Sequence, residues 1–260
     1  MRADRLLVHL GLADSRSAAQ RLIAAGCVRY ERVEGGQRVW RRLTKPSLDL
    51  PLDAALALDT TEHERYVSRA GLKLAGALAH TGLDVVGWVC LDVGQSTGGF
   101  TDCLLQAGAA RVVGVDVGHG QLHPRLRADA RVVCLEGVNA RHLSAAHLGV
   151  HLPVQGFDLI VVDAAFISLT LLLPPLATLL AAAGQVLALA KPQFEVGPRA
   201  VGKGGIVREA SLYAEVEHSL RAAAHAAGLR VKDWFDSPIT GADGNREFFL
   251  WAELSTRPGG

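Results

Sequence analysis

Residues 91–102 read LDVGQSTGGFTD, and this stretch decides the fold class. An apolar run that ends at Val93 leads into a glycine-rich turn, which is expected to open a helix. Glycines allow a backbone to approach a ligand closely, and a helix N-terminus offers N–H groups without intrahelical partners. Asp116 ends the next apolar run, where a carboxylate can accept hydrogen bonds from both hydroxyls of a ribose. The pattern predicts a strand, turn and helix that bind a cofactor containing adenosine.

Short β-like runs alternate with helical segments through much of the chain. The runs cover residues 89–93, 112–116, 132–135, 159–163, 186–190, 229–235 and 247–254. Such alternation is typical of a doubly wound α/β sheet with helices on both faces. We expect this α/β domain to span residues 65–260, after a small domain and linker that span residues 1–64.

Two other nucleotide-binding motifs fit the sequence less well. The turn after Val93 does not spell the G-x-G-x-x-G of a dinucleotide site, and Asp92 would repel a pyrophosphate, whereas an acidic side chain suits the ammonium of a methionine. Residues 197–204, GPRAVGKG, nearly spell a P-loop. However, Gly204 replaces the Ser or Thr that binds Mg²⁺, and Pro198 removes one N–H. We therefore favour S-adenosylmethionine as the cofactor.

The N-terminal part of the chain carries the basic excess. Residues 1–45 contain ten Lys or Arg against four Asp or Glu, although the formal net charge of the whole chain is only +1. Apolar spacing predicts two short helices within residues 2–28, the second capped by Asp14 or Ser15 and ended at Gly26. This polarity indicates a polyanionic partner, and a solvated charged surface is the alternative.

Residues 2–30, RADRLLVHLGLADSRSAAQRLIAAGCVRY, resemble the small α+β RNA-binding domain named after the fourth protein of the small ribosomal subunit, the S-four domain. The resemblance implies that basic side chains of a helical pair contact RNA phosphates, which supply most of the affinity of such domains. The candidate RNA-binding residues are Arg2, Arg5, Arg16, Arg21 and Arg29. A plain helical hairpin is the alternative.

Lysine is rare in this chain, with five lysines against twenty-two arginines, so the positions of two lysines are informative. Lys191 directly follows the run 186–190, and Asp163 ends the run before it. The carboxyl ends of strands line the ligand crevice of an open α/β sheet. Lys73 lies in a helical segment before the first run, and Glu247 opens the last run. We expect all four side chains to converge at one rim, and a single structural salt bridge is the alternative.

The chain as a whole resembles the TlyA, or hemolysin A, family of rRNA 2′-O-methyltransferases, which join an S-four domain to an FtsJ-like methyltransferase domain. The markers are YVSRAGLKL, LDVGQSTGGFTD, DLIVVDAAFISL, LALAKPQFEVG, VGKGGIVR and SPITGADGNREFF. The resemblance implies a Rossmann-like class I S-adenosylmethionine methyltransferase sheet, and ribosomal RNA or ribosomal subunits as the partner. It implies a cytidine ribose as the target.

The same resemblance implies a role for each candidate residue. The Lys-Asp-Lys-Glu tetrad of the family corresponds to Lys73, Asp163, Lys191 and Glu247. Lys191 would remove the proton of the 2′-hydroxyl as that oxygen attacks the methyl group. The residues around the methionine part of the cofactor are Gly94, Ser96, Thr97, Gly98, Gly99 and Phe100, with Asp116 on the ribose and Glu136 and Asn139 nearer the adenine. Gln95 and Ala165 depart from the family pattern, which affects fine positioning and leaves the tetrad intact.

Residues 164–190 contain no charged side chain and could be mistaken for a membrane span. Pro174 and Pro175 interrupt the apolar pattern, and Gly184-Gln185 break it again, so that a helix, a turn and a buried strand are favoured. The four cysteines form no C-x-x-C pair, and the chain shows no signal-peptide pattern, which points to a reducing cytoplasm. The ten histidines show no metal-ligand spacing, so no metal is expected, and no obligate protein partner is evident.

Other functions stay open at this point. An RNA-binding protein with a non-catalytic methyltransferase fold would keep the predicted sheet without needing the tetrad. A membrane-active hemolysin has only residues 164–190 in its favour. A pseudouridine synthase with an S-four domain would not need a domain built around an adenosyl cofactor.

Overall fold

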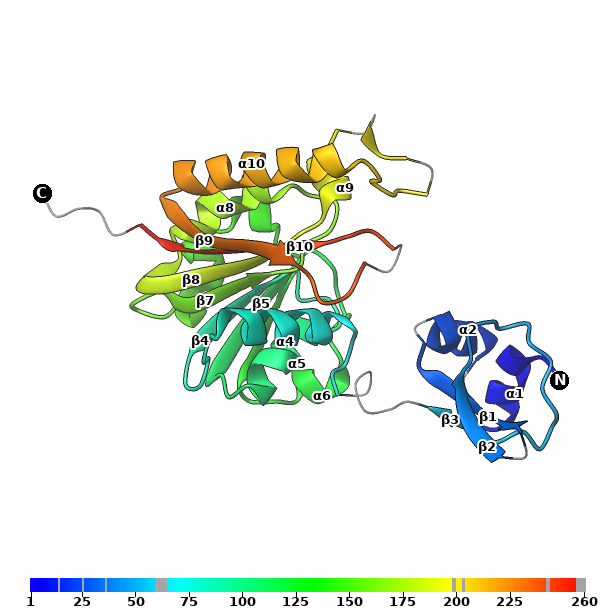
Figure 1. The fold of residues 1–260 in the computed structure, drawn as a ribbon. Coiled ribbons are helices and arrows are strands. Elements are labelled where there is room, and N and C mark those ends of the chain that lie inside the picture. Colours follow the sequence, from blue (N-terminus) through cyan, green and yellow to red (C-terminus); the bar gives the residue numbers. More distant parts are fainter. Residues whose placement is uncertain are drawn as a thin grey trace, which may run out of the picture. The chain divides into compact units, whose positions relative to one another are not determined.

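The computed structural model describes residues 1–13, 15–24, 26–35, 37–58, 65–197, 200–202, 204–241 and 244–255, without the side chains of Arg21, Glu34 and Gln37. These residues form two compact units, Met1–Arg65 and Tyr66–Gly260. Figure 1 shows that each unit has a sheet and helices of its own.

The first unit is a small α+β fold. Its elements are α1 (Ala3–His9), α2 (Arg16–Ala24), β1 (Val28–Glu34), β2 (Gln37–Arg42) and β3 (Leu56–Leu58). The three strands form an antiparallel sheet in the order β2-β1-β3. The two predicted helices are present, and Ser15 Oγ accepts a hydrogen bond from Ala18 N at 3.1 Å, as a helix cap does. The alternative cap, Asp14, lies outside the described residues.

A buried carboxylate joins the two helices of this unit. Asp4 of α1 accepts hydrogen bonds from Arg2 Nε and Nη2 at 3.1 and 3.0 Å, from Arg16 Nε at 2.9 Å and from Gln20 Nε2 at 2.9 Å. The hydrogen bonds from Arg2 hold the pKa of the Asp4 carboxyl well below its usual range. Leu6, Leu7 and other apolar side chains pack beside it as the core of the unit. Asp4 is therefore an ionised buried group whose partners all come from the same small domain.

The second unit contains the predicted doubly wound sheet. In spatial order its strands are β6 (Val132–Glu136), β5 (Arg111–Asp116), β4 (Val89–Val93), β7 (Phe157–Val162), β8 (Leu180–Ala190), β10 (Phe248–Leu254) and β9 (Leu229–Asp236). Neighbours from β6 to β8 are parallel, whereas β10 runs antiparallel to both β8 and β9. The α/β prediction is confirmed, and the structure shows that the last predicted strand, β10, is antiparallel and lies between β8 and β9.

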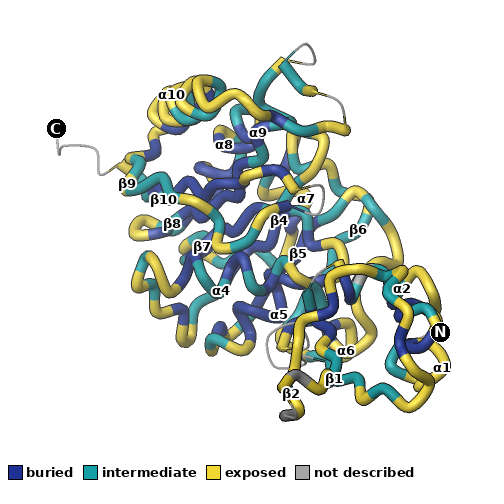
Figure 2. The backbone as a smooth tube through the Cα atoms, turned by 45° about the vertical axis from the view of Figure 1, so that its right-hand side comes forward, coloured by how far each residue is buried: buried dark blue, intermediate teal, exposed yellow. Residues whose placement is uncertain are grey.

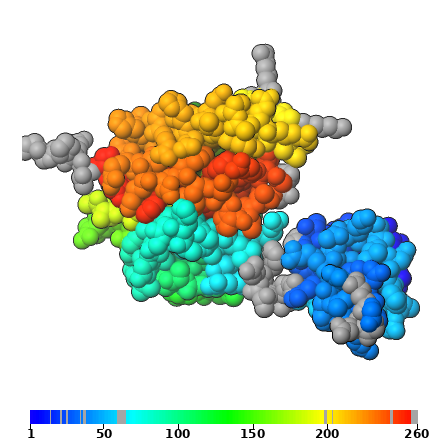
Figure 3. Space-filling view, viewed as in Figure 1, coloured from blue at the N-terminus to red at the C-terminus, as the bar shows by residue number. Residues whose placement is uncertain are grey.

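Helices cover both faces of this sheet (Figure 1). They are α4 (Ala70–Thr81), α5 (Gly99–Gln106), α6 (Pro124–Arg127), α7 (Ala145–Leu148), α8 (Leu169–Ala177), α9 (Pro192–Glu195) and α10 (Ala210–Ala226), with short 3-10 helices at Ala140–His142 and Gly149–His151. Figure 3 shows α10, in yellow to orange, above the β9–β10 end of the sheet.

Successive side chains of a strand point to opposite faces of the sheet, and here the two faces form two separate apolar clusters. Leu91, Val93 and Ala188 pack with α8 and α10 on one face. Cys90, Val161 and Leu189 pack with α4 and α5 on the other face. Figure 2 shows these strands as the buried centre of the unit, with the outward side of α10 exposed. We call the second face the α4/α5 face.

The uncharged stretch 164–190 forms a helix, a turn and a strand, as predicted. Helix α8 continues through Pro174 and Pro175, so the expected break at the prolines was wrong. Strand β8 begins at Leu180, but its pairing with β7 skips from Leu180 to Gln185, so an irregularity lies where Gly184-Gln185 was expected to break the pattern. Each proline removes one helical N–H, and burial of Leu172, Leu173 and Leu176 offsets that loss. Within the described residues, no helix combines the length and the apolar character needed to cross a membrane.

The position of Asp4 leads to a stability prediction. Asp4→Ala removes the acceptor shared by α1 and α2, and we expect it to destabilise the first unit by about 2–3 kcal/mol. Hydrogen exchange of the α1 and α2 amides in the full chain measures this loss, with the exposed Asp53→Ala as the control. Because the pKa of Asp4 is lowered, its contribution is present at neutral pH and is lost only as the pH falls below about 4. Unchanged exchange in Asp4→Ala would contradict this role.

Candidate functional site

The chain changes direction across the sheet between β4 and β7. From β4 the chain moves to β5 and β6 on one side, and it later returns to β7 and β8 on the other side. A ligand crevice forms at the carboxyl ends of strands at such a switch point. Gly94 follows β4 with φ +84°, and a Cβ at this position would lie 2.7 Å from the carbonyl oxygen of Asp163. Only glycine fits this contact between the two strand ends.

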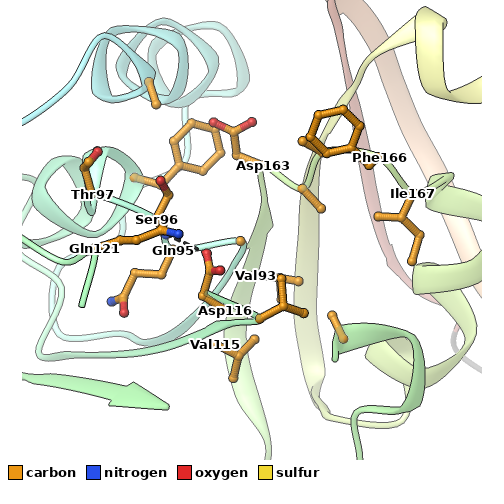
Figure 4. A pocket seen from close by; sticks show the side chains of 18 of the residues that line it. Val93, Gln95, Ser96, Thr97, Val115, Asp116, Gln121, Asp163, Phe166 and Ile167 are labelled. Carbon is orange, nitrogen blue, oxygen red and sulfur yellow. Dashed lines mark hydrogen bonds between the residues drawn. The ribbon is translucent and has the colours of Figure 1, made fainter. Parts of the chain in front are cut away.

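The turn predicted from LDVGQSTGGFTD is held by Asp116 at the end of β5. Ser96, which has φ +47°, donates its backbone N–H to Asp116 Oδ2 at 2.8 Å, and Gly118 N donates to Oδ1 at 2.7 Å. Figure 4 shows the Asp116 carboxylate turned toward the Ser96 backbone. Gly98, with φ +94°, is the N-cap of α5. Asp116 thus both orders the turn and presents its carboxylate to the crevice.

The crevice contains a pocket of about 590 Å³. This volume lies within the usual range for a small-molecule site. Seven of the predicted cofactor residues line the pocket: Gly94, Ser96, Thr97, Gly99, Phe100, Asp116 and Asn139. Asp163 and Lys191 of the predicted tetrad also line it. The turn, the β5 end and two tetrad residues therefore share one pocket.

Several lining residues were not singled out from the sequence. Gln121 lies over Gly118, whose added Cβ would meet the Gln121 amide nitrogen at 2.2 Å. Ser68 reaches the pocket from the segment before α4. Phe166 has a positive φ of +63° and a 90% exposed side chain at the rim of the pocket. No periodic pattern marks such loop residues, because their position depends on the packing of the loops.

Asp92 is not among the residues that line the pocket, and its expected contact with a methionine ammonium stays a prediction. It points to the α4/α5 face between Leu91 and Val93, which point to the other face, and it is 0% exposed. Thr101 Oγ1 donates a hydrogen bond to Asp92 Oδ2 at 2.6 Å. Burial raises the pKa of Asp92 to about 7. Through this hydrogen bond to Thr101, Asp92 stabilises the start of α5, which follows the cofactor turn.

Glu136 and Gly98 are likewise not among the residues that line the pocket, and their expected contacts with the cofactor stay predictions. Glu136 Oε1 accepts hydrogen bonds from Arg127 Nη2 at 2.6 Å and from Gly120 N at 2.9 Å, and the Arg127 guanidinium lowers the pKa of Glu136. A Cβ on Gly98 would lie 2.4 Å from Leu126 Cδ1, so Gly98 allows close packing of α6 on the turn. Both residues stabilise the loops around the pocket.

The unusual Gln95 has a structural explanation. Its side chain is buried and lies against Gly114 of β5, where an added Cβ would come within 2.0 Å of Gln95 Cδ. Gln95 Nε2 donates a hydrogen bond to Thr101 Oγ1 at 2.9 Å. Glycine at position 114 therefore provides the room that a larger residue at position 95 needs. Ala165, the other departure, lines the pocket.

The predicted tetrad forms two ion pairs at the carboxyl edge of the sheet. Lys191 Nζ lies 2.6 Å from Asp163 Oδ1, next to the pocket. Lys73 Nζ, from α4, donates to Glu247 Oε2 at 2.5 Å in a buried pair. Asp163 and Lys191 come directly after β7 and β8, and Glu247 comes directly before β10 rather than inside it.

Strand register places both ion pairs on the same face. Ala190 pairs with Phe248, so Lys191 and Glu247 are opposite each other at the next position. Val161, Leu189 and Phe249 belong to the α4/α5 face, and residues two positions further along a strand point the same way. Asp163, Lys191 and Glu247 therefore continue this face at its rim, where α4 supplies Lys73.

The arginines predicted to bind RNA lie in the first unit. Arg2 is half-buried and Arg16 is exposed, and both pair with Asp4, while Arg5 of α1 and Arg29 of β1 are exposed. The side chain of Arg21 lies outside the described residues. Among the described residues, no three His, Cys, Asp or Glu side chains form a group suited to a metal ion.

Comparison with known proteins matches both parts of the chain. The FtsJ-like methyltransferase family matches residues 66–254, and the S4 domain matches residues 1–31. The 16S/23S rRNA (cytidine-2′-O)-methyltransferase TlyA of Mycobacterium tuberculosis is 41% identical over 255 residues, which cover 98% of this chain and 90% of that protein. Hemolysin A of Brachyspira hyodysenteriae is 37% identical over 248 residues, which cover 95% of this chain and 98% of that protein.

A solved structure matches both units as well. It is a protein of Streptococcus thermophilus named as a hemolysin, with 41% sequence identity and a TM-score of 0.74. The match covers 99% of this chain and 90% of that chain.

Because Asp92 is buried, we expect the free energy of unfolding to depend on pH in an unusual way. Its raised pKa means that the folded chain holds a proton that the unfolded chain releases, so Asp92 costs stability as the pH rises from about 4 to 7. Each pKa unit corresponds to about 1.4 kcal/mol. We expect Asp92→Asn to raise Tm by several degrees near pH 8 and by much less near pH 4.

Thermal unfolding of the variant and of the wild type at both pH values measures this difference. The exposed Asp84→Asn is the matched control, and its Tm should follow the wild type at each pH. An Asp92→Asn variant that is less stable than the wild type by the same amount at both pH values would refute the neutral, protonated form of Asp92.

Proposed function

Because the chain belongs to the FtsJ-like methyltransferase family, we propose that it transfers a methyl group from S-adenosylmethionine to a ribose 2′-hydroxyl of ribosomal RNA. The observation that carries this proposal is the Lys191–Asp163 ion pair, which lines the pocket beside the glycine-rich turn. The relative from M. tuberculosis is named for cytidine in 16S and 23S rRNA, and we propose a cytidine here as well.

The pocket residues fit S-adenosylmethionine. Asp116 offers carboxylate oxygens for the ribose hydroxyls at the end of β5, and Gly94 lets the ligand approach the backbone between β4 and β7. Val117, Val138 and Leu172 supply apolar walls suited to adenine. When bound, this cofactor supplies an electrophilic methyl group on a positively charged sulfur.

Lys191 is the proposed base. A ribose hydroxyl is a weak nucleophile and must lose its proton as its oxygen bonds to the methyl carbon and the carbon–sulfur bond breaks. The neutral amine of Lys191 accepts this proton and becomes an ammonium. Asp163, 2.6 Å away, orients Nζ and stabilises the ammonium that results.

The second ion pair lies at the same rim as the first. Glu247, 2.5 Å from Lys73, holds the Lys73 ammonium in place at the strand ends that carry Asp163 and Lys191.

We propose that the domain of residues 1–64 holds the RNA and the domain of residues 65–260 performs the transfer. The match to the S4 domain and the exposed Arg5 and Arg29 support RNA binding by the first unit. Ribosomal RNA, free or within a subunit, is the proposed partner. A substrate of this kind places the protein in the cytoplasm.

Lys191→Met tests the proposed base. The variant keeps the length of the side chain and removes the amine, so we expect methyl transfer to ribosomal RNA to fall by about 10²- to 10⁴-fold. Binding of S-adenosylmethionine, measured by calorimetry, should remain. The matched control is Lys232→Met, which removes a lysine paired with Glu253 on the other end of the sheet.

The position of the transferred label decides the chemistry. Methyl groups on ribose 2′-oxygens protect the adjacent phosphodiester from alkali, so mapping the rRNA after reaction with labelled cofactor identifies the atom. A label on a base nitrogen, or full activity in Lys191→Met, would refute the mechanism. A wild-type protein that binds cofactor and RNA without transfer would support the non-catalytic alternative.

Arg5→Gln tests RNA binding by the first unit. Loss of one phosphate contact should weaken rRNA binding and reduce the slope of log affinity against log salt by about 1. Arg230→Gln, in β9 of the second unit, is the control. Titrations over a range of salt concentrations measure both quantities, and an unchanged slope in Arg5→Gln would argue against a phosphate contact at this residue.

A further inference from the structure

Two segments of the chain outside the cofactor pocket meet at one buried amide. Asn245 lies two residues before Glu247 and is only 2% exposed. Its Oδ1 accepts a hydrogen bond from Val207 N at 3.0 Å, and its Nδ2 donates to Gly205 O at 2.9 Å. The amide thus joins the segment that follows the P-loop-like motif to the segment that leads into β10. We call residues 205–207 the clamped segment.

The clamped segment is fastened a second time, on the other side of Glu247. Tyr213 of α10 donates its hydroxyl hydrogen to Val207 O at 2.7 Å. The ring centroids of Tyr213 and Phe248 lie 5.4 Å apart, and Phe248 directly follows Glu247 at the start of β10. The clamped segment is therefore attached, through Asn245 and Tyr213, to residues on both sides of a proposed tetrad member.

The backbone of Asn245 also sets the surroundings of the Glu247 carboxylate. Its carbonyl oxygen accepts a hydrogen bond from Gly241 N at 2.9 Å. A Cβ on Gly241 would lie 2.6 Å from Glu247 Oε1, so the backbone at Gly241 lies directly against this oxygen. The other oxygen, Oε2, is bound to Lys73 at 2.5 Å. The Glu247 carboxylate is therefore held between Gly241 and Lys73, and a shift of Asn245 moves one side of this site.

We propose that Asn245 is a positioning residue for methyl transfer, which sets Glu247 against Lys73 by fastening the clamped segment to the entry of β10. The inference rests on the proposed function, in which the Lys73–Glu247 pair belongs to the tetrad. Asn245 is not among the residues that line the pocket, so it acts through Glu247. An amide suits this task, because one side chain supplies both the acceptor and the donor that two backbone groups need. A buried hydrogen bond that stabilises only the fold is the alternative.

Asn245→Leu keeps the approximate size of the side chain and removes both hydrogen bonds of the amide. Because misplacement of a catalytic group by about 1 Å can cost on the order of 10²-fold in rate, we expect kcat to fall roughly ten- to hundredfold, with an unchanged Kd for S-adenosylmethionine. The matched control is Asp158→Leu, which removes a 2.8 Å hydrogen bond from Val89 N at the opposite, amino edge of the sheet. We expect the control to lose stability and to keep its kcat.

Asn245→Asp is a milder change at the same position. It keeps the acceptor for Val207 N and places an oxygen opposite Gly205 O, where the amide has a donor. Protonation of the new carboxyl restores a donor there, so the kcat of this variant relative to the wild type should rise as the pH falls. A relative kcat that falls with falling pH would contradict the need for a donor to Gly205.

A double-mutant cycle separates positioning from general destabilisation. If Asn245 acts through Glu247, Asn245→Leu should reduce single-turnover methyl transfer much less in a Glu247→Gln background than in the wild type, because the group that it positions is already impaired. Asp158→Leu should have the same small effect in both backgrounds. Full additivity of Asn245→Leu and Glu247→Gln would overturn the inference.

Hydrogen exchange of the full chain tests the same coupling without catalysis. Asn245→Leu should speed exchange of the Val207 amide and also of the Ser237 amide, which donates to Glu247 O at 2.9 Å. Asp158→Leu should leave both amides unchanged. If the wild type transfers no methyl group but Asn245→Leu speeds both amides, the proposed function fails and the coupling of the clamped segment to Glu247 stands. Unchanged exchange of the Ser237 amide would overturn that coupling.

Discussion

The ion pair between Lys191 and Asp163 depends on two parallel strands that end side by side. Strands β7 and β8 bring Asp163 and Lys191 to one edge, and their side chains meet 2.6 Å apart because both continue the α4/α5 face. A shift of either strand by one residue would turn its charged group to the opposite face, among the apolar side chains of α8 and α10. The site therefore depends on register, and register depends on the apolar alternation that fills both faces.

Buried charge in this protein is compensated locally. Asp4 has two arginines and a glutamine, and Glu247 has Lys73. Removing a charged group from water is costly unless a close partner and further hydrogen bonds replace the solvent. Asp92 differs, because Thr101 is its hydrogen-bond donor and burial raises its pKa to about 7. Burial thus favours the neutral carboxyl of Asp92 over its carboxylate.

The pocket combines groups of different chemistry at one edge of the sheet. Backbone groups of a strained turn and the Asp116 carboxylate suit the polar parts of S-adenosylmethionine. Asp163 and Lys191 line the same pocket, which is where a ribose must present its hydroxyl to the methyl group.

The sequence by itself determined the α/β sheet, the cofactor turn and the strand ends that carry Asp163 and Lys191, because apolar periodicity and glycine positions are local properties. The sequence also contains the motifs by which the chain resembles its family. Only the tertiary structure decided that Asp92 and Glu136 support loops, that α8 continues through its prolines, and that Phe166 lies at the rim of the pocket. Burial and hydrogen-bond partners depend on how segments pack together, as for Ser168 and Glu195, and no spacing rule in the sequence predicts them.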